Sequence, residues 1–172
     1  LLPYLLQDRC VDKAKGALEG IKSAALPTLR RALKDKRPKL RLKAIYLLRK
    51  LATGKHASVL LEALRNDSLD VRYHAVMGLK KHKNPKTMAT LLTALGAKLD
   101  TPMKPEETNE ELYRETLVEA LAAYGNASLP GLLRQAKQPG SPGRLPVLKH
   151  LVMRKERQAI PALISALSAP HT

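Results

Sequence analysis

Four arginines recur at related positions along the sequence, and they are the first residues whose type and spacing could do chemistry. They are Arg41, Arg72, Arg114 and Arg144. A row of guanidinium groups could bind an anion, because each group has several N–H donors and a permanent charge. A buried arginine instead pairs with groups of its own protein, since a buried charge needs a partner. We favour this structural role for the four arginines over ligand binding.

A strongly basic stretch is the second candidate. The chain has 31 Lys and Arg against 15 Asp and Glu, a formal charge of +16. Residues 1–86 hold 21 basic and 7 acidic residues, whereas residues 87–172 hold 10 and 8. Within residues 22–55, twelve basic residues are opposed by Asp35 alone. Such an imbalance favours acidic proteins or nucleic acid as partners, and a basic surface that is simply solvated is the third interpretation.

No arrangement typical of a catalytic or metal site is present. The sequence has a single cysteine, Cys10, and its five histidines are scattered without zinc-ligand spacing. It contains no Walker loop, no Gly-x-Ser-x-Gly and no His-Glu-x-x-His. We therefore expect a non-catalytic protein without a metal or cofactor. The lone cysteine is compatible with the cytoplasm, and no apolar run reaches the roughly 20 residues of a membrane span.

The apolar residues favour helices as the elements that position these groups. Leu and Ala supply 55 residues, Val and Ile supply 11, and Phe and Trp are absent. Leu and Ala are strong helix formers, whereas sheets favour β-branched and aromatic side chains. We expect an all-α fold.

The expected helices repeat along the chain. Residues 40–51 align with residues 71–82 at an offset of 31, and the series continues to Arg114 and Arg144 after a polar insert at about 98–111. Each unit predicts a short helix followed by a longer one with a single buried stripe. One such pair cannot bury its stripe alone, so the pairs must stack into a solenoid. We expect one repeat domain over residues 1–172, a fragment of a longer solenoid.

The repeat pattern resembles the HEAT-repeat family. The residues that carry the resemblance in one unit are Pro27, Asp35, Leu40, Arg41, Ala44 and Leu48. The 31-residue period and the segment 67–72 are similar to the short HEAT-like repeats of phycobilin lyases. This resemblance covers about residues 24–169 and implies a right-handed α-solenoid, an α-α superhelix. It also implies that each repeated arginine bonds an acidic residue near the preceding turn, as Asp35 could do for Arg41, forming a ladder through the stack.

The resemblance also implies a binding groove, because the second helix of each pair lines the concave face in this family. The residues that it places there are Lys39, Lys43, Tyr46, Lys50, Tyr73, His74 and Lys81. Our first hypothesis is a scaffold whose basic concave groove binds an acidic segment of a partner protein. The alternative is a module that binds the nucleic-acid phosphate backbone, which we favour less because no Phe or Trp could stack on bases. A bilin-lyase-like chaperone subunit is a third and remote hypothesis.

The two ends of the sequence are apolar, at residues 1–6 and 160–167. Terminal repeats of a solenoid normally have a polar outer face. We therefore expect further repeats or another chain to cover these ends.

Overall fold

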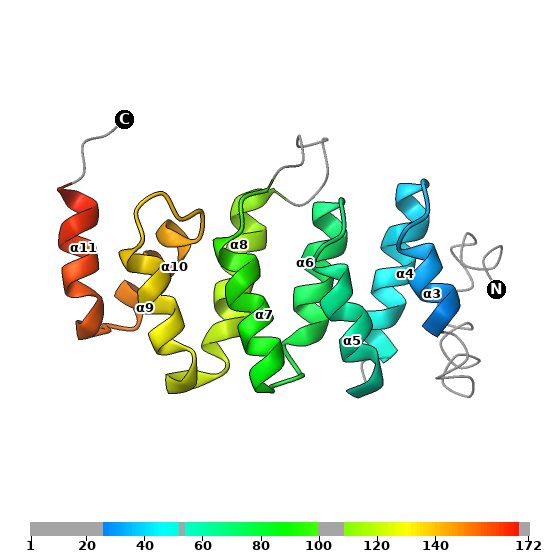
Figure 1. Cartoon of the computed structure of the whole chain (residues 1–172), viewed down its shortest axis with the longest axis horizontal. Helices are drawn as coiled ribbons and strands as arrows, with labels where there is room; N and C mark the ends of the chain where they lie inside the picture. Colours follow the sequence, from blue (N-terminus) through cyan, green and yellow to red (C-terminus); the bar gives the residue numbers. More distant parts are fainter. Residues whose placement is uncertain (1–25, 52–53, 100–108, 169–172) are drawn as a thin grey trace. The chain divides into compact units, whose positions relative to one another are not determined.

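A computed structural model describes residues 26–51, 54–99 and 109–168. Within these ranges the regular elements are nine α-helices and two short 3-10 helices, with no strand (Figure 1). This confirms the all-α expectation. The chain divides into two compact units, the first containing helices α3 to α6 and the second containing α7 to α11. Cys10, the apolar residues 1–6 and most of the insert at 98–111 lie outside the described residues.

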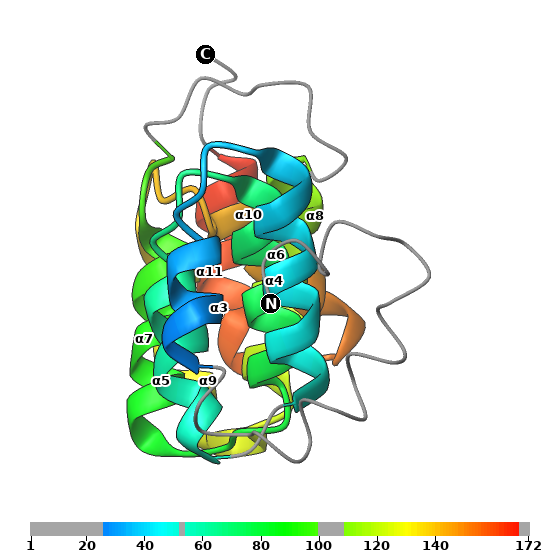
Figure 2. The same cartoon turned by 90° about the vertical axis from the view of Figure 1, so that its right-hand side faces the viewer.

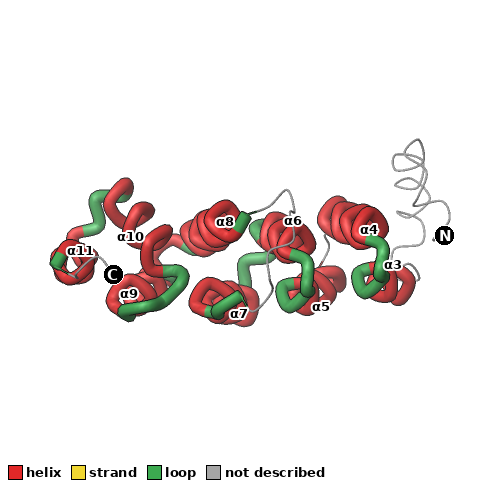
Figure 3. The backbone as a smooth tube through the Cα atoms, turned by 90° about the horizontal axis from the view of Figure 1, so that it is seen from above, coloured by secondary structure: helices red, strands yellow, loops and turns green. Residues whose placement is uncertain are grey.

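Unit 1 contains two helix pairs of the same kind. Its helices are α3 (Leu26–Ala32), α4 (Pro38–Leu51), α5 (Gly54–Ala63) and α6 (Leu69–Leu79). Helices α3 and α5 lie in one layer, and α4 and α6 lie in the other (Figures 2 and 3). The closest packing is between α4 and α6 and between α5 and α6. The longer second helices of the two predicted repeats are therefore neighbours.

The core of unit 1 follows the predicted stripe. Leu40, Ala44, Leu47 and Leu48 are each at most 2% exposed, as expected for one face of a helix that packs on its neighbours. Gly78 is needed where α6 passes α5. A Cβ atom there would lie only 2.8 Å from Cδ1 of the fully buried Leu60 side chain, so glycine permits the close approach of the two helices.

Short polar side chains start three of the helices. The hydroxyl of Ser68 accepts the Val71 N–H at the beginning of α6. Asn84 and Asn109 do the same for α7 and α8, each accepting the amide three residues later at 2.8 Å. These N-caps satisfy donors that have no partner inside the helix. They define where α6, α7 and α8 begin.

Unit 2 also alternates helices between two layers. Its elements are α7 (Pro85–Gly96), α8 (Glu110–Ala122), η2 (Gly125–Ala127), α9 (Leu129–Lys137), α10 (Arg144–Met153), η3 (Arg157–Ala159) and α11 (Ile160–Leu167). Helices α7 and α9 share one layer, α8 and α10 share the other, and α11 packs against α9 (Figure 3). Pro146 falls in the first turn of α10, where its missing N–H leaves no helical bond unmade.

Leucines and alanines fill most of the interior of unit 2. The largest fully buried side chain is Tyr113, which is 1% exposed. The other buried aliphatic side chains of this unit include Leu91, Leu95, Leu117, Leu121, Leu132, Val147 and Leu151. The described part of the chain thus has a helical, repeat-like architecture in each unit, with the apolar stripes of successive helices facing one another.

Candidate functional site

The repeated arginines of unit 1 bond to the protein's own backbone. Nη1 of Arg41 donates to the carbonyl oxygens of Asp35 at 3.0 Å and Lys36 at 3.2 Å. Nε of Arg72 donates in the same way to the carbonyl oxygen of Asn66. Both arginines therefore reach from a second helix to the turn that follows the first helix of the same pair. The carbonyls at a helix end lack helical partners and carry partial negative charge, which a guanidinium satisfies.

Arg114 does the same in unit 2 and is the most buried of the four, at 2% exposure. Nη1 donates to the carbonyl of Leu95 at 2.7 Å, and Nη2 donates to the carbonyl of Ala97 at 3.0 Å. Its Nε lies 2.7 Å from Oε1 of Glu110, one turn earlier on α8. Two carbonyls and one carboxylate thus satisfy a charge that would otherwise be unstable in the interior.

Arg144 completes the series. Its Nε donates to the carbonyl of Ala136, near the end of α9, at 3.2 Å. The four arginines therefore share one role: each caps the end of the preceding helix or the turn beyond it. The predicted acceptor was an acidic side chain, and Arg114 with Glu110 is the one case in which a carboxylate takes part.

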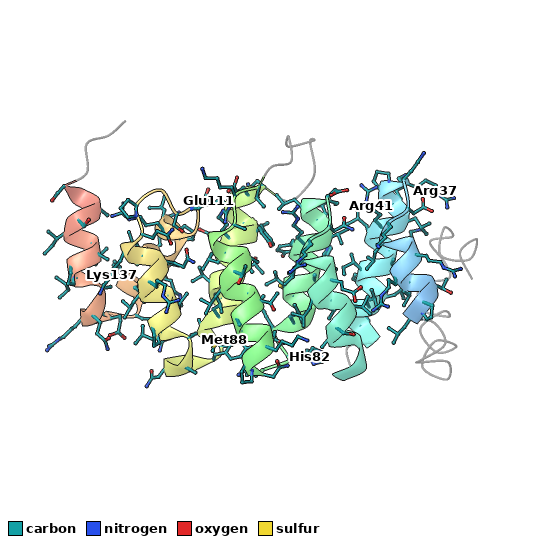
Figure 4. The ribbon with its side chains drawn as sticks, in the orientation of Figure 1. Arg37, Arg41, His82, Met88, Glu111 and Lys137 are labelled. Carbon is teal, nitrogen blue, oxygen red and sulfur yellow. The ribbon has the colours of Figure 1, made fainter. Side chains whose placement is uncertain are left out.

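Asp35 has a different partner from the one expected. Its Oδ1 accepts from Nε of Arg37 at 2.9 Å and from the Arg37 main-chain N–H at 3.0 Å, while Oδ2 accepts from Nη2 at 3.0 Å. These bonds lower the pKa of the Asp35 carboxyl to about 2. The expected ion pair with Arg41 is thus corrected to a bond between Arg41 and the Asp35 main chain. Figure 4 shows Arg37 and Arg41 at the end of α4 that the chain enters from α3.

The predicted binding residues all lie in unit 1, on α4, on α6 or just beyond α6. Three of them, Lys39, Lys50 and Lys81, are exposed. The other four are half-buried, namely Lys43, Tyr46, Tyr73 and His74. Part of this set forms a contact network between α4 and α6.

The network is centred on Arg49. Its guanidinium carbon lies 5.0 Å from the centre of the Tyr46 ring, and Nζ of Lys50 lies 5.3 Å from the same centre. Nη1 of Arg49 also lies 3.3 Å from Nδ1 of His74 on the neighbouring helix, and the His74 ring stands edge-on to Tyr73 at 5.1 Å. We call these five residues the α4–α6 cluster: Tyr46, Arg49, Lys50, Tyr73 and His74.

The contact between Arg49 and His74 links α4 to α6. A guanidinium has only N–H donors, so in a hydrogen bond between these side chains Nδ1 of His74 accepts. Arg49 was missing from the sequence-based set. The signal that could have found it is its spacing of three residues from Tyr46, which places both on one face of α4. Lys43 lies about one turn and Lys39 about two turns before Tyr46 on the same helix.

Charge around the cluster is strongly one-sided. The described residues of unit 1 include sixteen Lys and Arg but four Asp and Glu. In those of unit 2 the numbers are ten and five. Two exposed ion pairs of unit 1, Arg30 with Glu62 and Arg37 with Asp35, engage acidic groups away from the cluster.

The matching helices of unit 2 have a different surface. Nζ of Lys149 on α10 lies 2.7 Å from Oε1 of Glu111 and 3.6 Å from Oε1 of Glu115, both on α8. The hydrogen bond with Lys149 lowers the pKa of Glu111, and the same bond raises the pKa of Lys149. Charges on this face compensate one another, so the basic candidate surface is confined to unit 1.

The described residues contain no group of three or more His, Cys, Asp or Glu side chains that could hold a metal ion. Over the same ranges, every helix is too short or too polar to cross a bilayer. Neither the protein-family models nor the curated proteins with which the sequence was compared match it.

Proposed function

We propose that the basic face of unit 1, which we define as the α4–α6 cluster with Lys39, Lys43 and Lys81, binds an acidic segment of a partner protein. The observation that carries this proposal is the α4–α6 cluster, in which two cations lie over Tyr46 and one of them reaches His74. A half-buried aromatic group next to exposed cations is a surface that suits a mixed acidic and apolar peptide.

The positive charge of unit 1 favours a negatively charged partner. Lys50 of the cluster is exposed, as are Lys39 on α4 and Lys81 just beyond α6, and the described residues of unit 1 include few acidic residues to neutralise them. An acidic segment would therefore be attracted from a distance and held by several short contacts. No catalytic step is part of this proposal.

Nucleic acid is the competing partner, because phosphates would be attracted by the same charges. Single-stranded binding surfaces also need free ring faces on which bases stack. Arg49 and Lys50 already lie over the ring of Tyr46, and the sequence has no Phe or Trp. These two observations favour the protein partner.

The proposal includes an architecture, a right-handed α-solenoid of HEAT-like repeats. The two-layer alternation of helices within each unit and the shared role of the four arginines support it. Small-angle scattering of the whole chain tests it. A solenoid predicts an elongated particle, and a compact particle in which the two units fold back on each other would contradict it.

The binding proposal can be tested with matched charge reversals. The test variant changes Lys39, Lys50 and Lys81 to Glu, and the control variant changes Lys86, Lys98 and Lys137 of unit 2 to Glu. All six side chains are exposed, so both variants should fold and both have the same net charge. The probes are a fluorescent peptide of alternating Glu and Tyr, and single-stranded and duplex oligonucleotides of similar charge.

We expect the test variant to lose at least about tenfold in affinity for the acidic peptide, and the control variant to keep affinity within about twofold. Equal losses in the two variants would mean that net charge alone attracts the peptide, and would refute the site. If oligonucleotides bind more tightly than the peptide near physiological salt, the result would refute the protein partner and favour nucleic acid.

A further inference from the structure

Exposed apolar side chains gather at one end of unit 2. Six large hydrophobic residues are exposed in the described part of the chain, and five of them lie on α10 or α11. These five form the apolar end face: Leu145 (63% exposed), Val152 (52%), Met153 (84%), Ile160 (50%) and Ile164 (60%). A concentration of this kind marks an interaction site more often than scattered single residues do.

Helical spacing aligns these side chains. Leu145 and Val152 are seven residues apart on α10, and Ile160 and Ile164 are four residues apart on α11. Both spacings place the members of a pair on the same side of a helix. Both helices also pack against α9, and the short η3 helix contacts each of them. The two apolar stripes therefore lie on helices that α9 and η3 connect at the same end of unit 2.

Equivalent positions in the earlier helices show what normally covers such stripes. Val152 aligns with Arg49 at an offset of 103 residues, and Arg49 contacts His74 of the next second helix. Ile160 and Ile164 align with Leu129 and Leu133 of α9.

Leu129 and Leu133 are half-buried, and α11 packs on α9. In these two cases the next helix packs on the helix that carries the aligned positions. Among the described residues, the stripes of α10 and α11 have no such helix over them.

We propose that the apolar end face binds an amphipathic, acidic helix of another protein, which packs there as the next helix of the series. The apolar stripes fit a helix with aliphatic residues at intervals of three and four. Met153 adds an adaptable side chain at the rim.

The charge of the occupant follows from the segment that joins α10 to α11. Arg154, Lys155 and Arg157 are exposed there, against the half-buried Glu156. Acidic residues flanking the apolar face of the partner helix would complement them. A second copy of this chain fits less well, because a symmetric contact would bring two identical basic segments together.

The probe is a synthetic helical peptide with leucines on one face and glutamates on the others. Its partner control has lysines in place of the glutamates. The protein variant is Val152→Ser with Ile164→Ser, and the control is Leu112→Ser, which changes the sixth exposed hydrophobic residue, on α8, and likewise adds no charge. All three positions are exposed, so circular dichroism should report an unchanged fold.

We expect the glutamate peptide to bind the natural chain and to lose at least about tenfold in affinity with the double variant. Leu112→Ser should leave the affinity within about twofold, and the lysine peptide should bind more weakly than the glutamate peptide. Equal affinity of the peptide for the double variant and the natural chain would refute the apolar end face as the binding surface. Equal affinity of the natural chain for the two peptides would refute the proposal that the partner helix is acidic.

Sedimentation of the chain alone tests the competing occupant. Self-association that disappears in the double variant would show that a second copy covers the face, and would overturn the proposal. A monomer at all concentrations supports it. Because the glutamate peptide could also bind the basic face of unit 1, each comparison is repeated in the chain with Lys39, Lys50 and Lys81 changed to Glu. In that chain, a remaining effect of the Val152 and Ile164 double variant reports on the apolar end face alone.

Discussion

Arg49 on α4 joins two aromatic neighbours on different helices. Nη1 lies 3.3 Å from Nδ1 of His74 on α6, and the guanidinium carbon lies 5.0 Å from the centre of the Tyr46 ring on α4. A single half-buried side chain thus connects the second helices of two successive pairs. The contact serves the stability of unit 1 as well as the chemistry of its surface.

Replacing Arg49 by Ala should therefore destabilise unit 1. The cation–π contact is worth about 0.5–1 kcal/mol at an exposed site, and the hydrogen bond is worth about 0.5–1.5 kcal/mol. We expect a loss of about 1–2 kcal/mol in the free energy of unfolding, measured with urea. Lys50→Ala is the control, because Lys50 lies over the same ring on its own helix. A loss as large for Lys50 as for Arg49 would contradict the role of the bond between helices.

The second prediction compares two of the repeated arginines. Arg114 is 2% exposed and bonds two carbonyls and Glu110, whereas Arg41 is half-buried and bonds two carbonyls of a turn. Arg114→Ala would leave buried polar groups unpaired, at a cost of about 3 kcal/mol. Arg41→Ala should cost about 1 kcal/mol, because water can replace its bonds.

Arg114→Lys tests the geometry of this cap. A lysine has the charge but not the planar fork that reaches Leu95, Ala97 and Glu110 together, so we expect it to recover less than half of the loss. Full recovery by lysine, measured by thermal or urea unfolding, would show that the charge alone matters. Equal losses for Arg41→Ala and Arg114→Ala would refute the argument from burial.

Much of the helical framework could be predicted from the spacing of apolar residues. The stripe from Leu40 to Leu48 is a property of one helix, and local periodicity reveals it. The arginine contacts were harder to predict. A carbonyl acceptor such as that of Asp35 or Ala136 is present at every residue, so sequence cannot distinguish it from its neighbours.

The α4–α6 cluster shows the same limit. Tyr46 and Lys50 were found because they share a helix face with Lys43. The contact between Arg49 and His74 depends on how α4 and α6 cross, which residue spacing within either helix does not specify. The predicted ion pair between Asp35 and Arg41 was wrong because Arg37, which is closer in sequence, binds the Asp35 carboxylate instead.

A third prediction uses two glycines that face different neighbours. Gly78→Ala would push a Cβ to 2.8 Å from Cδ1 of Leu60, which is fully buried and cannot retreat. Overpacking of this kind costs about 1–3 kcal/mol, more than the roughly 0.5–1 kcal/mol that Ala gains in a helix. We expect Gly78→Ala to lower the free energy of unfolding.

Gly96→Ala is the matched control. Its Cβ would approach the amide end of Gln135, at 2.7 Å from Nε2, and Oε1 of that half-buried side chain accepts the Ser141 hydroxyl at 2.5 Å. The amide is the far end of a long side chain and can move aside at the cost of this bond, which the helix preference of alanine partly offsets, so we expect a loss of no more than about 1 kcal/mol. A loss for Gly96→Ala equal to that of Gly78→Ala would mean that the two helix contacts are equally rigid.

The last prediction concerns pH and His150 on α10. Its Nε2 is buried without a hydrogen-bond partner. Burial lowers the pKa of His150, the positive charge of Arg154 lowers it further, and the negative charge of Glu119 on α8 acts in the opposite direction. The unfolded chain, with a histidine pKa of about 6.5, therefore binds a proton at a higher pH than the folded chain does. Stability should be full above about pH 6.5 and should fall as the pH decreases from there to the lower pKa of the folded state.

The melting temperature at pH 7.5 and at pH 5.5 measures this effect. We expect the natural chain to lose more stability over this interval than His150→Gln, which has no titrating group at this position. The other histidines contribute equally to both proteins, so the difference between the two pH dependences isolates His150. An identical pH dependence in the two proteins would show that the imidazole is protonated as easily in the folded unit as in the unfolded chain. A steeper dependence in the variant would reverse the sign of the argument.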